Sequence, residues 1–233
     1  MNLEKNKDEF LSKLLKKNVF IFNSNKLNLE KILSNKKHLL ILKTKKKISL
    51  NIKKKYDIYV RSKLITYKKN TKTLRHFKNE NKLQLINAKK NHIKQINSIC
   101  KQNIYGSRFQ LDKNIKLSFL INYRVKWIKN FFLGKRADYL FVAISKKKIV
   151  KGFILIMLRK SNIIIDQIVV GNKYKKKGVG SFLINESIKK LKNKPKFIFA
   201  STYQHNKGSI KMYEKLNFKQ TDYKFIYHLY LKK

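Results

Sequence analysis

The feature that most constrains this chain is an apolar run that leads into a turn with two glycines. Residues 162–170 (NIIIDQIVV) are almost wholly aliphatic, and residues 171–181 (GNKYKKKGVGS) follow directly. A short apolar run bounded by glycine is typical of a buried strand. Beyond the turn, helical spacing places four apolar residues on one side: Leu183, Ile184, Ile188 and Leu191. A strand, a tight turn and a helix in this order favour an α/β fold.

The other residues between 82 and 231 alternate between the strand and helix periods in the same way. Helices are predicted over 90–102, roughly 113–133 and 207–216, with a loop over 105–114. The remaining apolar runs predict strands over 82–87, 139–144, 150–158, 196–202 and 223–231. This order predicts a mixed central β-sheet flanked by helices, in a domain over residues 81–233.

Residues 1–80 are expected to form a smaller N-terminal α/β portion whose role the sequence does not reveal. Its apolar runs predict short strands at NVFIFN, HLLILKT, KISLNI, YDIYV and KLITYKK. Residues 70–81 are polar and predict a linker. Near the start, Phe10, Leu11, Leu14 and Leu15 have helical spacing. The helix they predict packs on the protein or touches a membrane surface.

The chain carries 58 Lys and Arg against 12 Asp and Glu, a formal net charge of +46. Lysine is spread over the whole length and outnumbers arginine, whereas base readout and bidentate phosphate recognition favour arginine. We attribute the charge to a coding genome rich in A and T, and we expect no specific nucleic-acid partner. A general attraction for polyanions, including phosphate-bearing small molecules, is the alternative.

The cysteine count and the apolar runs exclude several classes of protein. Cys100 is the single cysteine, which excludes a disulfide framework and a cysteine-based zinc site, and we expect no metal. The sequence has no apolar run of membrane-spanning length, and its first residues lack the apolar core of a signal peptide. A cytoplasmic protein without a membrane span is therefore the expectation.

The two-glycine turn has the chemistry of an anion site. Gly178 and Gly180 let the backbone turn tightly and bring its N–H groups close to a ligand. The positive end of the helix dipole points to the same place. Lys175, Lys176 and Lys177 add mobile positive charge. The Walker A and Rossmann patterns both fail here, because lysine and leucine occupy positions where each needs a small residue.

What remains is a basic residue followed by x-x-Gly-x-Gly after a strand. The stretch IVVGNKYKKKGVGSFLI resembles the acetyl-CoA pyrophosphate loop of the GNAT superfamily of N-acetyltransferases. The superfamily pattern is Gln/Arg-x-x-Gly-x-Gly/Ala, and Lys175 stands in its first position. Residues 206–218 (NKGSIKMYEKLNF) are similar to a second superfamily block, with matches at Asn206, Ser209, Tyr213, Asn217 and Phe218. Both motifs together imply a GNAT fold.

The resemblance implies acetyl-CoA as cosubstrate. By this resemblance, the pantetheine arm would pair with the backbone of residues 168–170 as an extra strand. The Val170 region would supply an N–H to the oxyanion hole. Asn206 bonds the pantetheine or, alternatively, acts as a helix N-cap. The implied acetyl-CoA contacts are Ile168, Val169, Val170, Lys175, Lys176, Lys177, Gly178, Val179, Gly180, Ser181, Asn206 and Ser209.

The same resemblance places the general acid at Tyr213, whose phenol would protonate the leaving thiolate. The alternative is that Tyr213 is only a core aromatic. For the base that removes a proton from the amine, Asp166 and His228 are the two candidates, and a chain of water molecules is the third option.

Residues 105–144 resemble the TDP-fucosamine acetyltransferase group, in the triplet SRF, the stretch WIKN and the run DYLFVA. This resemblance implies a nucleotide-linked 4-amino-4,6-dideoxyhexose as acceptor, in lipopolysaccharide or related surface-polysaccharide biosynthesis. Ser107 and Arg108 would contact the sugar or its diphosphate, unless they are simply a surface loop.

Two other functions stay open. A GNAT enzyme acting on another small-molecule or protein amine is one, and a basic binding module without catalysis is the other. A homodimer through the sheet edge or the N-terminal portion is a further expectation, which no single residue supports.

Overall fold

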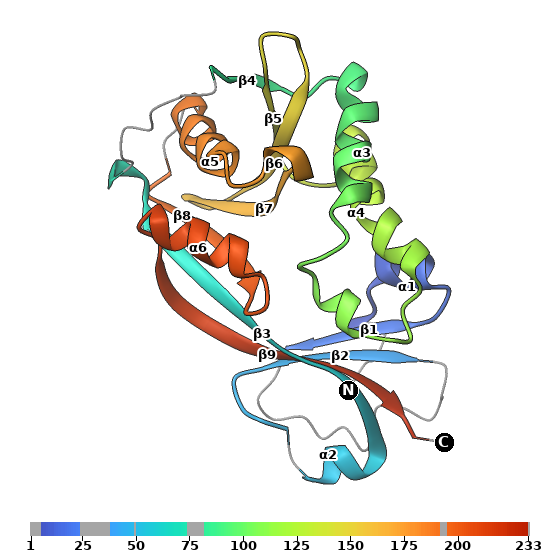
Figure 1. Ribbon diagram of the computed structural model, residues 1–233. Coiled ribbons are helices and arrows are strands. Elements are labelled where there is room, and N and C mark those ends of the chain that lie inside the picture. The colour runs from blue at the N-terminus through green and yellow to red at the C-terminus, as the bar shows by residue number, and fades with distance from the viewer. Residues whose placement is uncertain (1–5, 24–37, 49, 74–81, 192–194, 233) are drawn as a thin grey trace.

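The computed structural model describes residues 6–23, 38–48, 50–73, 82–191 and 195–232 (Figure 1). Its strands are β1 Val19–Asn23, β2 Leu39–Thr44, β3 Tyr56–Asn70, β4 Gln84–Asn87, β5 Tyr139–Ile144, β6 Val150–Arg159, β7 Asn162–Val170, β8 Phe197–Tyr203 and β9 Lys219–Leu231. They form one nine-stranded sheet in the order β1-β2-β9-β3-β8-β7-β6-β5-β4. The pairs β1–β2 and β7–β8 are parallel and the others antiparallel, so the predicted mixed sheet is confirmed.

Helices cover both faces of this sheet. The α-helices are α1 Glu9–Leu15, α2 Leu50–Lys55, α3 Ile93–Gln102, α4 Leu117–Phe132, α5 Val179–Lys190 and α6 Lys207–Lys215. Short 3₁₀ turns are η3 Thr71–Thr73, η4 Lys90–His92, η5 Arg108–Leu111 and η6 Asn172–Tyr174. Figure 1 shows α5 and α6 on one face, and α1, α3 and α4 on the other, as their separate apolar clusters require.

Helix α1 shows how local sequence fixes an element here. The Asp8 carboxylate accepts a hydrogen bond from the Leu11 N–H at 2.8 Å, which caps the helix start. Lys16 adopts a left-handed conformation and ends the helix. Leu11 is buried, and Phe10 and Leu14 pack against the same apolar cluster under the sheet. The apolar face of α1 therefore packs on the protein, the first of the two predicted alternatives.

Two predictions for the N-terminal portion are wrong. The stretch KISLNI, expected as a strand, contains the start of α2, because Ile52 packs there against the cluster around Phe20 and Tyr227. Strand propensity of β-branched residues is weak and yields to such packing. The stretches YDIYV and KLITYKK are parts of one long strand, β3, which continues through the polar pair Arg61 and Ser62.

Strand β3 joins the N-terminal portion to the rest of the sheet. It pairs with β9 on one side, from Tyr56↔Leu231 to Lys68↔Lys219, and with β8 on the other. Residues 64–68 therefore lie between two strands of the C-terminal part. The domain boundary at residue 80 stays a prediction, and residues 74–81 of the expected linker lie outside the described residues.

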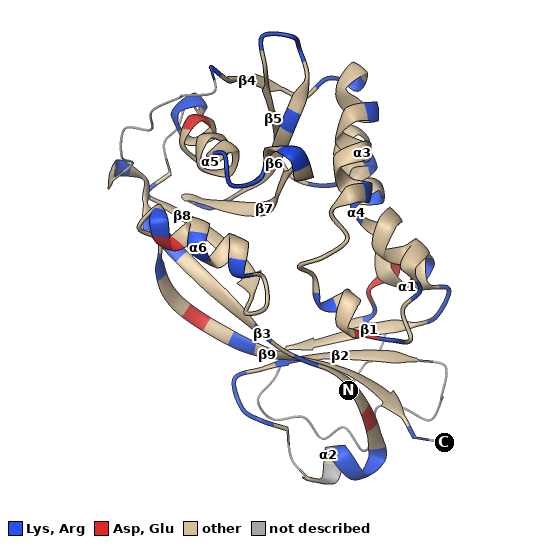
Figure 2. Ribbon diagram, viewed as in Figure 1, with Lys and Arg blue, Asp and Glu red and all other residues tan. Residues whose placement is uncertain are grey.

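Lysine and arginine occur on almost every described element, on both faces of the sheet (Figure 2). No helix in the described ranges combines the length and apolar character that a membrane crossing needs. Among the same residues, no three His, Cys, Asp or Glu side chains gather as a metal site would require.

Candidate active site

The sheet splits beside β7. Strands β7 and β8 pair only from Asn162↔Phe197 to Ile165↔Ala200. On its other side β7 stays paired with β6 as far as Val170, apart from a register shift that leaves Asp166 as an extra residue. Such a bulge bends the strand that carries it. In the described part of the chain, residues 166–170 thus have no strand partner on the β8 side, and we call this gap the β7–β8 opening.

The glycine turn lies at the end of β7, just past the β7–β8 opening. Gly178 is the N-cap of α5 and has φ of 77°, a left-handed conformation that side chains disfavour. Among the described residues no side chain caps α5, and its first turn contains no acidic residue. The first N–H groups of α5 are therefore available to an anionic ligand. Lys175, Lys176 and Lys177 are all exposed beside them.

Gly180 packs closely against α6. A Cβ at this position would lie 2.5 Å from the Met212 sulfur of α6 and 3.8 Å from a methyl group of Val170. A larger residue here would therefore require the flexible Met212 side chain to move. The bare helix start, the lysines and the glycines together fit a diphosphate such as that of CoA.

Arg124 approaches this loop from α4. Lost hydration and the positive charge of Arg124 lower the pKa of Lys175, which places the two cations near each other. The Arg124 Nη1 is buried and has no hydrogen-bond partner among the described residues. Arg124 is thus a further cation near the glycine loop, and its Nη1 could donate a hydrogen bond to a ligand.

Asn206 caps α6, as one of its two predicted roles requires. Its Oδ1 accepts a hydrogen bond from the Ser209 N–H at 3.3 Å. A Cβ on Gly106 would lie 3.0 Å from the Asn206 Nδ2, so the loop before η5 packs closely against this cap. The cap thus links the second sequence motif to the loop that carries Ser107 and Arg108.

Tyr213 is 3% exposed and belongs to the core cluster between the sheet and α5. Its ring contacts those of Tyr67 and Phe218, with centroids 5.5 and 5.3 Å away. Burial raises the pKa of Tyr213, so the phenol keeps its proton over the whole working pH range. This protonation state suits a general acid, and it equally suits a core aromatic.

Asp166 has both carboxylate oxygens engaged. Arg136 donates from Nε and Nη2 to the two oxygens of Asp166, each at 2.7 Å, in a bidentate pair. The guanidinium of Arg136 also lies 4.0 Å from the ring centre of Trp127 on α4. Asp166 is therefore held in a fixed ion pair beside the β7–β8 opening.

His228 also has both ring nitrogens engaged. Its Nδ1 lies 2.7 Å from the Asp112 Oδ2, and its Nε2 accepts a hydrogen bond from the Arg108 Nε at 3.1 Å. Tyr230 donates to the same Asp112 oxygen at 2.9 Å. Burial, and the charge of Arg108, lower the pKa of His228 to about 4, although Asp112 opposes this. The imidazole is neutral, and neither nitrogen has a free lone pair.

Arg108 belongs to a small polar cluster on the face of the sheet that carries α1 and α4. Its Nη1 donates to the Tyr203 hydroxyl at 2.8 Å. Tyr203 follows the point where β8 leaves β7, so Arg108 lies on the β8 side of the opening. Ser107, its neighbour, is buried. Burial, followed by the charges of Arg108 and Lys224, lowers the pKa of Lys43 on β2, which places a second cation nearby.

Sequence reasoning missed several residues of this region: Lys43, Asp112, Arg124, Arg136, Gln167 and Tyr203. One signal could have indicated Asp112, since a chain with 12 acidic and 58 basic residues has few carboxylates to spare for ordinary surface positions. The others come together only through the fold. Gln167 on β7 is 92% buried, and neither polar atom of its side-chain amide has a partner among the described residues.

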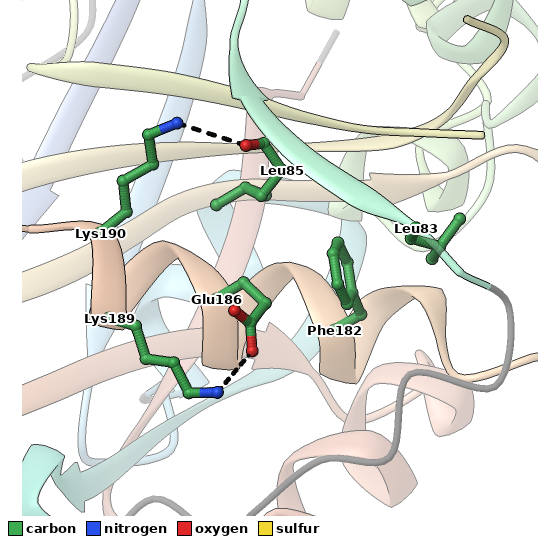
Figure 3. Close-up of a pocket in the computed structure, with 6 residues that line it drawn as sticks. All are labelled: Leu83, Leu85, Phe182, Glu186, Lys189 and Lys190. Atoms are coloured by element: carbon green, nitrogen blue, oxygen red, sulfur yellow. Dashed lines mark hydrogen bonds and ion pairs between the residues drawn. The ribbon is translucent and has the colours of Figure 1, made fainter. Parts of the chain in front are cut away.

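A separate hollow of about 400 Å³ lies between the edge strand β4 and α5, bounded by Leu83, Leu85, Phe182, Glu186, Lys189 and Lys190 (Figure 3). Its polar groups are already paired, because Lys189 contacts Glu186 at 2.7 Å and Lys190 donates to the Leu85 carbonyl. None of the predicted site residues lines it. We therefore take the β7–β8 opening as the candidate active site.

Comparison with known proteins addresses the family of this chain. Residues 104–218 match the model of the acetyltransferase (GNAT) family, a range that includes the glycine loop and Tyr213. A search of curated proteins yields no match.

Among solved structures, one similar fold is a functionally unknown conserved protein from Staphylococcus epidermidis. Its TM-score is 0.67 at 15% identity, over 93% of this chain and 85% of that one. Another is a putative GNAT acetyltransferase from Novosphingobium aromaticivorans, with a TM-score of 0.55 at 9% identity over 86% and 78%. These likenesses support the fold alone. The match of residues 104–218 to the family model identifies the chain as a member of the GNAT acetyltransferase family, whose enzymes use acetyl-CoA.

Proposed function

We propose that this enzyme transfers an acetyl group from acetyl-CoA to the amine of a nucleotide-linked 4-amino-4,6-dideoxyhexose, a precursor of surface polysaccharide. The observation that carries this acceptor is Arg108, which two hydrogen bonds hold at the β7–β8 opening, with Lys43 close by. Fixed cations at this position favour an acceptor that carries phosphate.

The donor side follows from the glycine loop. The N–H groups at the start of α5, with Lys175, Lys176 and Lys177, would bind the diphosphate of CoA. The unpaired side of residues 168–170 would hold the pantetheine arm as a β-strand holds an added strand. Acetyl-CoA then supplies the acetyl group at the opening.

For the proton transfers, Tyr213 remains our proposed acid, since burial keeps its phenol protonated. Asp166 and His228 are the predicted bases, but Arg136 engages both oxygens of the first, and Arg108 and Asp112 engage both nitrogens of the second. Of the three options, removal of the amine proton through water agrees best with these contacts.

A cationic acceptor, such as a polyamine or a basic peptide, is the second candidate class. Carboxylates at the opening would favour it. Among the described carboxylates in this region, Asp112 is 2% exposed and bonded to His228, Asp166 is paired with Arg136, and Asp8 caps α1. This disposition favours an anionic acceptor. The cytoplasmic location and the homodimer stay predictions.

The experiment is a thiol-release assay with purified protein, acetyl-CoA and a panel of amines. The panel contains TDP- and UDP-linked 4-amino-4,6-dideoxyhexoses, polyamines and basic peptides. We expect free CoA only with an amino-sugar nucleotide. Turnover with polyamines or peptides alone would refute the proposed acceptor and leave the family assignment intact.

A further inference from the structure

His228 and Asp112 form a buried pair whose hydrogen positions follow from chemistry alone. The two residues are 0% and 2% exposed. A guanidinium only donates, so the His228 Nε2 that meets Arg108 must be the acceptor. The ring hydrogen therefore sits on Nδ1 and points at Asp112, whose hydrogen bonds with His228 and with Tyr230 favour the carboxylate form.

This tautomer determines where Arg108 can point. A neutral imidazole with Nδ1–H presents one acceptor, Nε2, in the plane of the ring. Arg108 donates its Nε–H to that atom and its Nη1 to Tyr203, so both ends of the guanidinium are anchored. The hydrogen bonds among the described residues leave its Nη2 without a partner. The anchored side chain holds that nitrogen in one orientation.

We infer that His228 and Asp112 are positioning residues that fix the direction of Arg108, and that Arg108 binds the phosphate of the acceptor. This inference rests on the proposed function, because it requires an anionic acceptor. It assigns His228 a role different from that of a general base. Asp112 lies 116 residues from His228 in sequence. It orients the His228 ring, and the ring in turn orients Arg108.

Charge and burial support a phosphate group in particular. A phosphate oxygen can accept a charge-assisted hydrogen bond from Nη2 of Arg108, which the bonds of Nε and Nη1 hold in place. Lys43 faces the same region from β2, and Asp8 is the one carboxylate that raises its pKa. A phosphate at this place would balance two cations whose positive charges otherwise repel.

Three variants separate positioning from proton transfer. His228→Gln keeps an acceptor for Arg108 and a donor for Asp112 but cannot titrate. His228→Phe removes both bonds. Arg108→Lys keeps the positive charge and removes the fork. Each is assayed for kcat and for the KM of both substrates across pH, with the amino-sugar nucleotide as acceptor. Resonances of ¹⁵N-labelled Arg108 Nε–H and of the His228 ring report the contacts without any acceptor.

We expect His228→Phe and Arg108→Lys to raise the acceptor KM by roughly 10-fold or more, as the loss of a charge-assisted hydrogen bond does. The KM for acetyl-CoA stays unchanged. His228→Gln recovers most of the acceptor KM, keeps the wild-type pH profile and keeps the Arg108 Nε–H resonance. Should His228→Phe fail to fold, Arg108→Lys and His228→Gln still carry the comparison.

Three results would overturn the inference. If His228→Gln loses kcat as His228→Phe does, together with the acidic limb of the pH profile, His228 is a base. If the Arg108 contact is lost while the acceptor KM stays constant, Arg108 does not bind the acceptor. Turnover of cationic amines alone would refute the proposed function, and this inference with it, while the resonances would still report the buried contacts.

Discussion

The two halves of the proposed active site are built in opposite ways. The acetyl-CoA side comes mainly from two local motifs, residues 166–181 and residues 206–218, each of which is continuous in the chain. The acceptor side is assembled from η5, β2, β8 and β9, whose residues lie far apart in the chain. A contiguous motif can be recognised from its sequence pattern. A site whose residues are brought together only by the fold has no such pattern.

The largest effect should come from Tyr213→Phe, which removes the proposed acid from the motif-defined side. We expect kcat to fall roughly 1,000-fold, within the range for general acid catalysis, with an unchanged melting temperature. Tyr227→Phe is the matched control, because Tyr227 is also buried and its hydroxyl has no partner among the described residues. An unchanged kcat in Tyr213→Phe would mean that Tyr213 is only a core aromatic.

The second prediction concerns the acceptor side and the dependence of the free energy of unfolding on pH. The folded-state pKa of His228 is lowered to about 4, from an ordinary 6.5. The stability that its neutral form contributes is therefore present above about pH 6.5 and is lost as pH falls toward 4. We expect a loss of about 3 kcal/mol in the free energy of unfolding over this window.

Denaturant titrations of the wild type and of His228→Gln at several pH values would measure this term. The variant should show a shallower decline, because glutamine does not titrate. His92→Gln is the comparison variant. Burial lowers the pKa of His92 too, but His92 lies in η4, outside the Arg108 contacts, and we expect its replacement to change the slope less. Equal slopes in the wild type and in His228→Gln would contradict the buried neutral imidazole.

Gly180→Val tests how tightly the glycine turn is packed. The added side chain would meet Met212, and overpacking of this kind costs about 1–3 kcal/mol. We expect kcat/KM for acetyl-CoA to fall roughly 10-fold or more. Gly208→Ala is the control, because its nearest neighbouring atom is 4.0 Å from the new Cβ.

A double variant sharpens this result. Gly180→Val with Met212→Ala removes the contact that the new side chain would make with the Met212 sulfur. If the melting temperature recovers while the KM for acetyl-CoA stays high, the ligand itself needs the bare backbone. If both recover, Gly180 serves only the packing of α5 against α6.

The smallest effect should come from Lys175→Ala. Lys175 is exposed, and exposed charges are screened by salt. We expect the KM for acetyl-CoA to rise about 3-fold at low ionic strength and to approach the wild-type value at high salt. Lys147→Ala, which makes the same charge change in the β5–β6 turn, should have no effect. If the KM for acetyl-CoA rises equally in both variants, Lys175 acts only through the overall positive charge of the protein.

The sequence by itself determined the α/β class, most elements between residues 82 and 231, and the glycine turn with its family. It could do so because strands, turns and helices there follow local periodicity and because backbone N–H groups at a helix start bind anions in any context. It misjudged KISLNI, where the packing of Ile52 against the sheet outweighed the strand propensity of its β-branched residues.

Only the tertiary structure decided how the predicted bases are engaged and what holds Arg108. The sequence offered Asp166 and His228 as titratable side chains, but their partners, Arg136 and Asp112, come from distant segments. The insertion of β3 between β8 and β9 was likewise unreadable, since pairing between strands depends on long-range packing. The pKa of a side chain depends on the charged and hydrogen-bonding groups around it. For Asp166 and His228 the fold determines which groups these are.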